Sequence, residues 1–194
     1  MSLADWVGHL NRGRPFFYLA DLMKLGGQSR QTARKTAQRL RKQGLLMRIG
    51  PEIYANGLRP PSIEAAACVL RPAYISFEHA LFLHGLLSQA TTLVTCATLG
   101  RPGHITTDLG EIEYHHIKDA LYHGFEPTPD SLLATPEKAL LDLLYLRLRR
   151  GEKPRLDELD PTPLDQTILT RLARLYPRSV QSLLSPRVSI NINT

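Results

Sequence analysis

The sequence lacks several features that would direct its interpretation. It contains only two cysteines, Cys68 and Cys96, and both lie among apolar neighbours. We therefore expect buried thiols in a reducing compartment and no disulfide framework. No run of about eighteen apolar residues occurs, which argues against a membrane-spanning helix. The first residues lack a basic stretch followed by an apolar core, so no secretory signal is expected and the predicted location is the cytoplasm.

Motifs for metal binding or catalysis are also lacking. Among the seven histidines, His79 and His84 lie five residues apart on an expected helix, which separates them by about 140°. HExxH, CxxC, GxSxG, GxGxxG and GxxxxGK[ST] patterns do not occur. The sequence thus predicts no metal site, no catalytic residues and no enzyme, although it does not exclude a site assembled from distant residues.

Acidic residues are scarce in the first third of the chain. Residues 1–60 contain eleven Lys or Arg but only three acids, which gives a net charge of +8. The remaining 134 residues contain thirteen Lys or Arg and fifteen acids, for a net charge of −2. A basic segment joined to a nearly neutral remainder indicates a polyanionic partner for that segment alone.

The periodicity of residues 1–60 predicts a winged helix-turn-helix domain. Ser29 is a favourable N-cap for a helix beginning at Arg30, and Gly44 is suited to end it. Apolar and β-branched residues on either side of Gly50-Pro51 indicate a hairpin. The expected elements are, in order, helices at 4–10, 16–26 and about 30–42 and strands at 45–50 and 52–57.

A mixed α/β domain is expected from about residue 61 to 185, followed by a loosely held tail at 186–194, so that the whole chain belongs to the α+β class. The expected elements are helices at 63–70, 76–87, 135–151 and 164–177 and strands at 91–100 and on either side of 108–110. The helix at 135–151 has Thr135 as N-cap and a leucine stripe for the core. Lys138, Asp142 and Arg147 are expected on its solvent-exposed face.

The helix at 30–42 is the strongest candidate for a functional surface. At 100° per residue, Ala33, Ala37 and Leu40 share a narrow buried arc, and the opposite face carries long hydrogen-bond donors without an acid. Arg, Lys and Gln side chains bind phosphates and base edges. A solubilising face is the alternative, but such faces normally mix charges of both signs. The expected DNA contacts are Ser29, Arg30, Gln31, Thr32, Arg34, Lys35, Gln38 and Arg39 on the helix and Arg48 in the hairpin.

Four stretches of the chain together resemble the AbiEi family of antitoxins, which belong to type IV toxin–antitoxin systems related to abortive-infection loci. They are the N-terminal helical and hairpin unit, YISFEHALFLHGL at 74–86, IEYHHIKDALYHGF at 112–125 and ATPEKALLDLLYL at 134–146. The last is the most specific, and the resemblance covers roughly residues 10–185. It implies a winged-helix domain that binds inverted repeats in the operon's own promoter and represses transcription. It also implies a C-terminal domain that counteracts a nucleotidyltransferase-like toxin, and no cofactor.

The sequence leaves several alternatives open. A stand-alone transcription factor with a ligand- or protein-sensing C-terminal domain fits the same pattern. An enzyme anchored by its winged helix and a protein-interaction module are further rivals. The operator sequence, the number of copies on one operator and any direct contact with the toxin also stay open.

Overall fold

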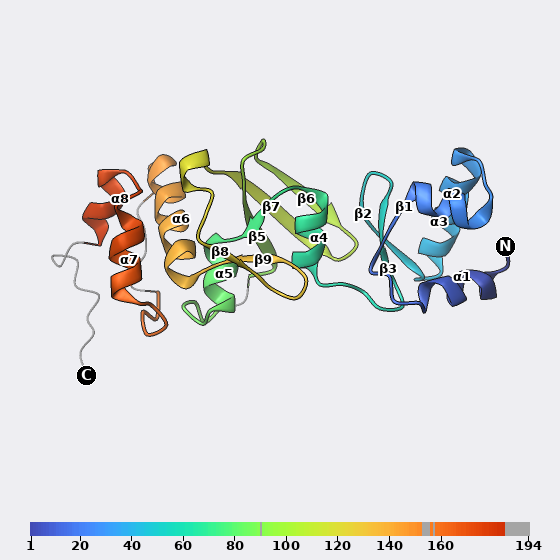
Figure 1. Cartoon of the computed structure of the whole chain (residues 1–194), viewed down its shortest axis with the longest axis horizontal. Coiled ribbons are helices and arrows are strands. Elements are labelled where there is room, and N and C mark those ends of the chain that lie inside the picture. Colours follow the sequence, from blue (N-terminus) through green and yellow to red (C-terminus); the bar gives the residue numbers. More distant parts are fainter. Residues whose placement is uncertain (90, 153–155, 157, 185–194) are drawn as a thin grey trace. The chain divides into compact units, whose positions relative to one another are not determined.

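The computed structural model describes residues 1–89, 91–152, 156 and 158–184, so the tail expected at 186–194 lies outside the described residues. The chain contains both helices and strands, which confirms the expected mixture of α and β structure (Figure 1). The chain divides into two compact units. The first comprises Met1–Leu70 and Ile105–Glu111, and the second comprises Arg71–His104 and the described residues from Ile112 on.

The first unit contains four helices and a three-stranded sheet among its described residues. The elements are α1 (Leu3–Leu10), β1 (Phe16–Tyr18), α2 (Leu19–Gly26), α3 (Arg30–Lys42), β2 (Leu46–Gly50), β3 (Ile53–Asn56) and α4 (Ile63–Leu70). The sheet is antiparallel in the order β1-β3-β2. Ala66 of α4 packs with Ile49 and Ala55 of this sheet, so the first unit continues to Leu70, past the boundary expected near residue 60.

The prediction of a single helix at 16–26 is wrong for its first three residues. Phe16–Tyr18 form the strand β1, which pairs with β3 and brings Phe17 opposite Tyr54. The helix α2 then begins at Leu19, and the Asp21 carboxylate accepts the Tyr18 N–H at 2.8 Å. The apolar spacing of this segment suits a helix, but pairing with a distant strand decides the conformation of its first three residues.

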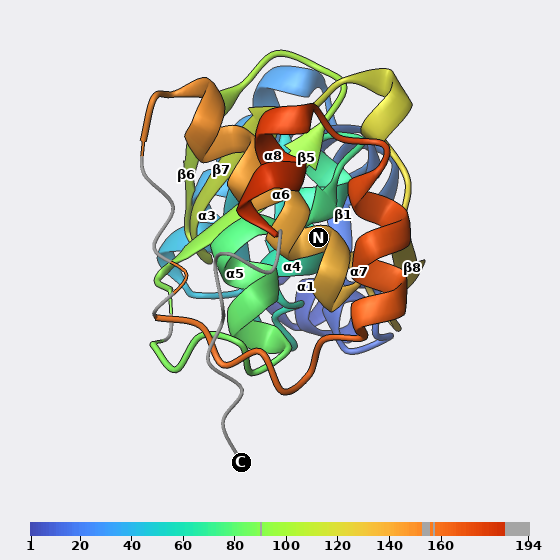
Figure 2. The ribbon, with the colours of Figure 1, turned by 90° about the vertical axis from the view of Figure 1, so that its left-hand side faces the viewer.

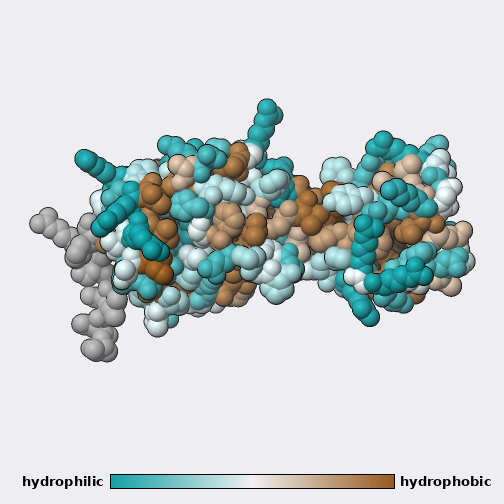
Figure 3. Space-filling model, in the orientation of Figure 1, coloured by the Kyte–Doolittle hydropathy of each residue, from teal (hydrophilic) through white to brown (hydrophobic). Residues whose placement is uncertain are grey.

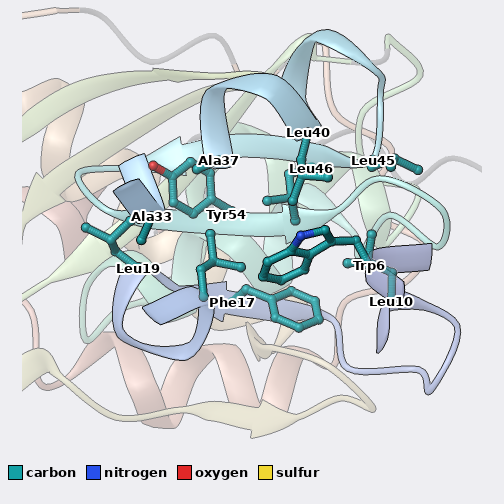
Figure 4. Close-up of a cluster of buried hydrophobic side chains, with 11 residues drawn as sticks. Trp6, Leu10, Phe17, Leu19, Ala33, Ala37, Leu40, Leu45, Leu46 and Tyr54 are labelled. Atoms are coloured by element: carbon teal, nitrogen blue, oxygen red, sulfur yellow. The ribbon is translucent and has the colours of Figure 1, made fainter. Parts of the chain in front are cut away.

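The core of the first unit brings the helices and the sheet together. Trp6 and Leu10 of α1 and Phe17 of β1 are almost completely buried. Ala33, Ala37 and Leu40 of α3 face them, as the helical periodicity predicts (Figure 4). Alanine on the buried face lets the α3 backbone approach its neighbours closely, so this packing fixes which face of α3 is exposed.

From residue 71 on, the chain forms a six-stranded sheet with helices beside it. The elements are β4 (Tyr74–Ile75), α5 (Phe77–Leu83), β5 (Leu93–Thr98), β6 (Gly103–Thr107), β7 (Gly110–His116), a 3₁₀ turn at Asp119–Leu121, β8 (Phe125–Pro127), β9 (Leu132–Ala134), α6 (Pro136–Arg149), α7 (Gln166–Ala173) and α8 (Arg178–Leu183). The strand order is β6-β7-β5-β4-β9-β8, with β4 parallel to β9 and antiparallel to β5. The short elements β4, β8, β9 and α8 were not predicted.

The helix α6 is the centre of the second unit. Thr135 caps it by accepting the Lys138 N–H at 3.3 Å, as expected. It contacts α5, α7 and α8, which surround it in both views (Figures 1 and 2). Because neighbours cover it on several sides, α6 buries far more than a leucine stripe. The expectation that Lys138 and Asp142 face solvent is therefore wrong, since both side chains are completely buried.

A network of polar side chains surrounds this buried pair. The Lys138 ammonium lies 2.5 Å from Asp142 Oδ1. The hydroxyl of Tyr176 contacts both groups at 2.7 Å, and Tyr74 and Ser76 donate to Asp142 Oδ2 at 2.9 and 2.8 Å. Burial lowers the pKa of Lys138 against the opposing effect of Asp142. Burial also raises the pKa values of both tyrosines, which the neighbouring Asp142 charge raises further. Every polar group in the network has a partner, as a buried charge requires.

Replacing one member of this pair is expected to destabilise the second unit. Lys138→Met leaves the Asp142 carboxylate buried without its cation, and we expect a loss of about 3–5 kcal/mol in the free energy of unfolding. Urea denaturation followed by far-ultraviolet circular dichroism measures it. Lys118→Met, at an exposed position, is the control. Equal midpoints for the two variants would contradict a structural role for the network.

Candidate nucleic-acid interface

The ends of α3 are fixed by the residues that the sequence indicates. The Ser29 hydroxyl accepts the Thr32 N–H at 3.3 Å, so it is the N-cap. Gly44 adopts a left-handed conformation with φ of +70°, and its N–H donates to the Arg41 carbonyl at 2.9 Å. Only glycine adopts this conformation without a steric cost, so the helix ends here and the chain turns into β2.

The nine residues expected to contact DNA are all exposed. Ser29 precedes α3, Arg48 lies on β2, and the other seven lie along α3. Figure 3 shows hydrophilic side chains standing out from the surface of the first unit. The exposed positions are Ser29, Arg30, Gln31, Thr32, Arg34, Lys35, Gln38, Arg39 and Arg48.

The structure brings some of these residues together in one open groove of about 620 Å³ between α3 and the β2–β3 hairpin. The groove is lined by Arg30, Arg34, Gln38, Arg41, Arg48, Pro51, Glu52 and Tyr54. Arg48 thus joins the arginines of α3, although it lies on another element. The other five predicted residues do not line the groove: Ser29, Gln31, Thr32, Lys35 and Arg39.

Some arginines on the basic face of α3 have acidic partners that lie outside this helix. Glu52, in the turn between β2 and β3, bonds to two arginines of α3. Arg30 donates to it from Nε at 3.2 Å and from Nη2 at 2.6 Å. Arg34 does so at 3.2 and 2.5 Å. These hydrogen bonds lower the pKa of the Glu52 carboxyl, so it is ionised at neutral pH. The expectation of an exposed face without paired acids is therefore wrong for Arg30 and Arg34.

Asp108 is a second acidic partner that the sequence did not reveal. Its carboxylate accepts from Nε and Nη2 of Arg41 at 2.8–3.0 Å and from the backbone N–H of Arg48 at 2.6 Å. Its own N–H donates to the Arg48 carbonyl at 2.8 Å. Asp108 lies 67 residues after Arg41, and only its position in an Asp-Leu-Gly turn marks it in the sequence. Asp108 thus forms hydrogen bonds with both backbone groups of Arg48, which lies on the edge strand β2.

The remaining cations of α3 have no carboxylate partner among the described residues. Lys35, Arg39 and Lys42 are exposed and make no ion pair within the described part of the chain. Gln38 and Gln31 are also exposed. Exposed, unpaired cations on one helix attract an anion in a salt-dependent way. The lysine ammonium groups on this face can bind phosphates as point charges. Its glutamine amides and arginine guanidinium groups can also recognise a ligand through hydrogen bonds.

The histidines considered as metal ligands contact protein groups instead. His79 Nδ1 lies 3.0 Å from the Thr91 hydroxyl, and His84 Nε2 lies 2.7 Å from the Ala134 carbonyl. Within the described ranges, no group of three His, Cys, Asp or Glu side chains is arranged to hold a metal ion.

A scan against models of known protein families found no family that matches this chain, and a search of curated proteins found no matching protein. Among the helices of the described residues, none is long and apolar enough to cross a membrane.

The backbone of Glu52 predicts an unusual response to substitution. Its φ is +61°, a left-handed conformation that costs a residue with a Cβ atom more than it costs glycine. Glu52→Gly and Glu52→Ala both remove the contacts with arginine, but only glycine relieves the backbone. We expect Glu52→Gly to melt roughly 4–8 °C higher than Glu52→Ala in a thermal scan. Equal melting temperatures would show that the conformation carries no cost.

Proposed function

We propose that the first unit is a winged helix-turn-helix domain that binds double-stranded DNA through α3. The observation that carries this proposal is the exposed basic face of α3, where Lys35, Arg39 and Lys42 have no carboxylate partner among the described residues. Two further features support it. A three-residue turn with left-handed Gly27 joins α2 to α3, and the β2–β3 hairpin follows directly. A helix-turn-helix places its second helix in the major groove in this way.

The positions of the side chains suggest how the contacts are divided. In a recognition helix the N-terminal residues contact base edges, which assigns this role to Arg30, Gln31 and Arg34. Lys35, Arg39 and Arg48 then contact phosphates, which position the domain without reading sequence. A second copy on the other half of an inverted repeat would raise the affinity through effective concentration.

We extend the proposal to the whole chain from its resemblance to the AbiEi antitoxins. The protein would bind inverted repeats in its own promoter as an autorepressor, and its C-terminal domain would counteract a nucleotidyltransferase-like toxin. The support is the ATPEKALLDLLYL segment at 134–146, which forms most of the central helix α6. Because four of its five leucines, Lys138 and Asp142 are buried, this segment supports the fold of the second unit and offers few side chains to a partner.

The DNA-binding proposal is tested with the promoter of the protein's own gene. Fluorescence anisotropy compares the native duplex with a scrambled duplex at two salt concentrations. We expect tighter binding to the native duplex that weakens as salt rises. Arg34→Ala/Lys35→Ala is expected to abolish promoter binding and retain the fold. The control, Arg101→Ala/Lys118→Ala, removes the same charge from exposed positions after residue 70. Promoter binding by Arg34→Ala/Lys35→Ala with an unchanged salt dependence would exclude α3 as the recognition helix.

The antitoxin role needs a separate experiment. The proposal predicts a nucleotidyltransferase-like toxin gene beside this one. Expression of that toxin should arrest growth, and co-expression of this chain should restore it. The Arg34→Ala/Lys35→Ala variant, expressed from an unrelated promoter, should restore growth equally if the C-terminal domain carries the activity. Failure of the intact chain to restore growth would favour a stand-alone transcription factor.

A further inference from the structure

Glu52 lies at a position whose backbone conformation is unfavourable for glutamate. It follows Pro51 in the hairpin turn with φ of +61°, and its carbonyl accepts the Leu19 N–H at 2.8 Å. Glycine or asparagine adopts this conformation at lower cost. The advantage of glutamate at this position must therefore lie in its side chain, which reaches Arg30 and Arg34.

Both arginines present the same edge to the carboxylate. Each donates from Nε and Nη2, the side edge of the guanidinium group. The Nη1 atoms have no hydrogen-bond partner among the described residues. The end edge, formed by one N–H of Nη1 and the second N–H of Nη2, is thus available on both side chains.

The free end edge is suited to base recognition. A guanidinium group donates two parallel hydrogen bonds from this edge to O6 and N7 of guanine. A free arginine loses much rotamer freedom when it forms such a pair. A carboxylate that already holds the side edge reduces this loss, because the side chain is oriented before the DNA arrives.

We propose that Glu52 is a positioning residue that orients Arg30 and Arg34 as a pair of guanine-reading forks. This inference rests on the proposed DNA binding. The two arginines lie about one turn apart on α3, which is close to the spacing of about three or four residues between recognition-helix positions that contact neighbouring bases. The ligand is therefore a duplex with two guanines close to each other in the major groove.

A competing role for Glu52 makes a different prediction. A carboxylate that merely occupies the phosphate-binding edge of the arginines would weaken the binding of every duplex equally. Its removal would then raise the affinity for native and scrambled DNA by the same factor. A positioning carboxylate instead affects the ratio of the two affinities, because it acts on base contacts.

The experiment compares the wild-type protein with Glu52→Gln on native and scrambled promoter duplexes. Glutamine keeps the size of the side chain and removes the charge that holds both guanidinium groups. We expect the ratio of affinities to fall about tenfold, in the range of one bidentate base contact, while binding to the scrambled duplex is unchanged or tighter. Glu126→Gln, an exposed position on β8, is the control for the change in net charge and should keep the wild-type ratio.

Two further measurements identify the atoms involved. Replacing single guanines of the native duplex by 7-deazaguanine removes the N7 acceptor. We expect this replacement at one or two positions to lower the affinity of the wild-type protein, and to lower the affinity of Glu52→Gln much less. Arg30→Lys/Arg34→Lys keeps both charges without the fork, so it should lose discrimination and retain binding to the scrambled duplex. This variant also tests the inference if Glu52→Gln does not fold.

The outcomes separate this inference from the proposed function. Wild-type protein that binds both duplexes equally would contradict sequence-specific DNA binding and the guanine readout together. If the wild type discriminates, an unchanged ratio in Glu52→Gln would overturn the role of Glu52 alone. If Arg30→Lys/Arg34→Lys still distinguishes the native from the scrambled duplex, the proposed role of Glu52 would be overturned as well.

Discussion

The constraint on which the first unit depends is the lack of any carboxylate within α3. Six cations on thirteen residues repel one another, and the helix cannot form the pairs between successive turns that stabilise most exposed helices. Its partners must come from elsewhere in the chain. Glu52 and Asp108 supply them from two separate turns, and both contact the face of α3 that lines the groove with β2 and β3. The acids are thus placed by tertiary structure, and the opposite edge of the basic face has no such partner among the described residues.

The second unit contains a buried pair of charges that are partners on the same helix. Lys138 and Asp142 are completely buried, and Tyr74, Ser76 and Tyr176 complete their hydrogen bonds. A pair of this kind contributes little stability compared with apolar side chains, but removing one partner is costly. It therefore ties α6 to β4 and to the segment after α7 in one arrangement. Most of the charge on α3 in the first unit is exposed, whereas this pair is enclosed in the second unit.

Local signals in the sequence predicted the elements that local interactions decide. The ends of α3, the buried arc of Ala33, Ala37 and Leu40 and the cap at Thr135 were all predicted, because each depends on residues within a few positions. The failures depend on distant partners. Phe16–Tyr18 are a strand because β3 lies beside them, and Lys138 is buried because three other helices cover α6. For the candidate site, all nine predicted residues are exposed, but the roles of Glu52 and Asp108 could not be read from periodicity.

The two acidic residues differ in a way that assigns different roles to the arginines. Asp108 holds the Arg41 side chain and both backbone groups of Arg48, so releasing Arg41 would also leave an edge of β2 without its partner. Arg41 is therefore fixed as part of the fold. Glu52 bonds only to side chains of α3 through its carboxylate, and it leaves the end edge of each guanidinium group available. Of the arginines along the groove, Arg30 and Arg34 combine a side edge held by a carboxylate with an Nη1 atom that has no partner among the described residues, and the proposed base recognition requires both properties.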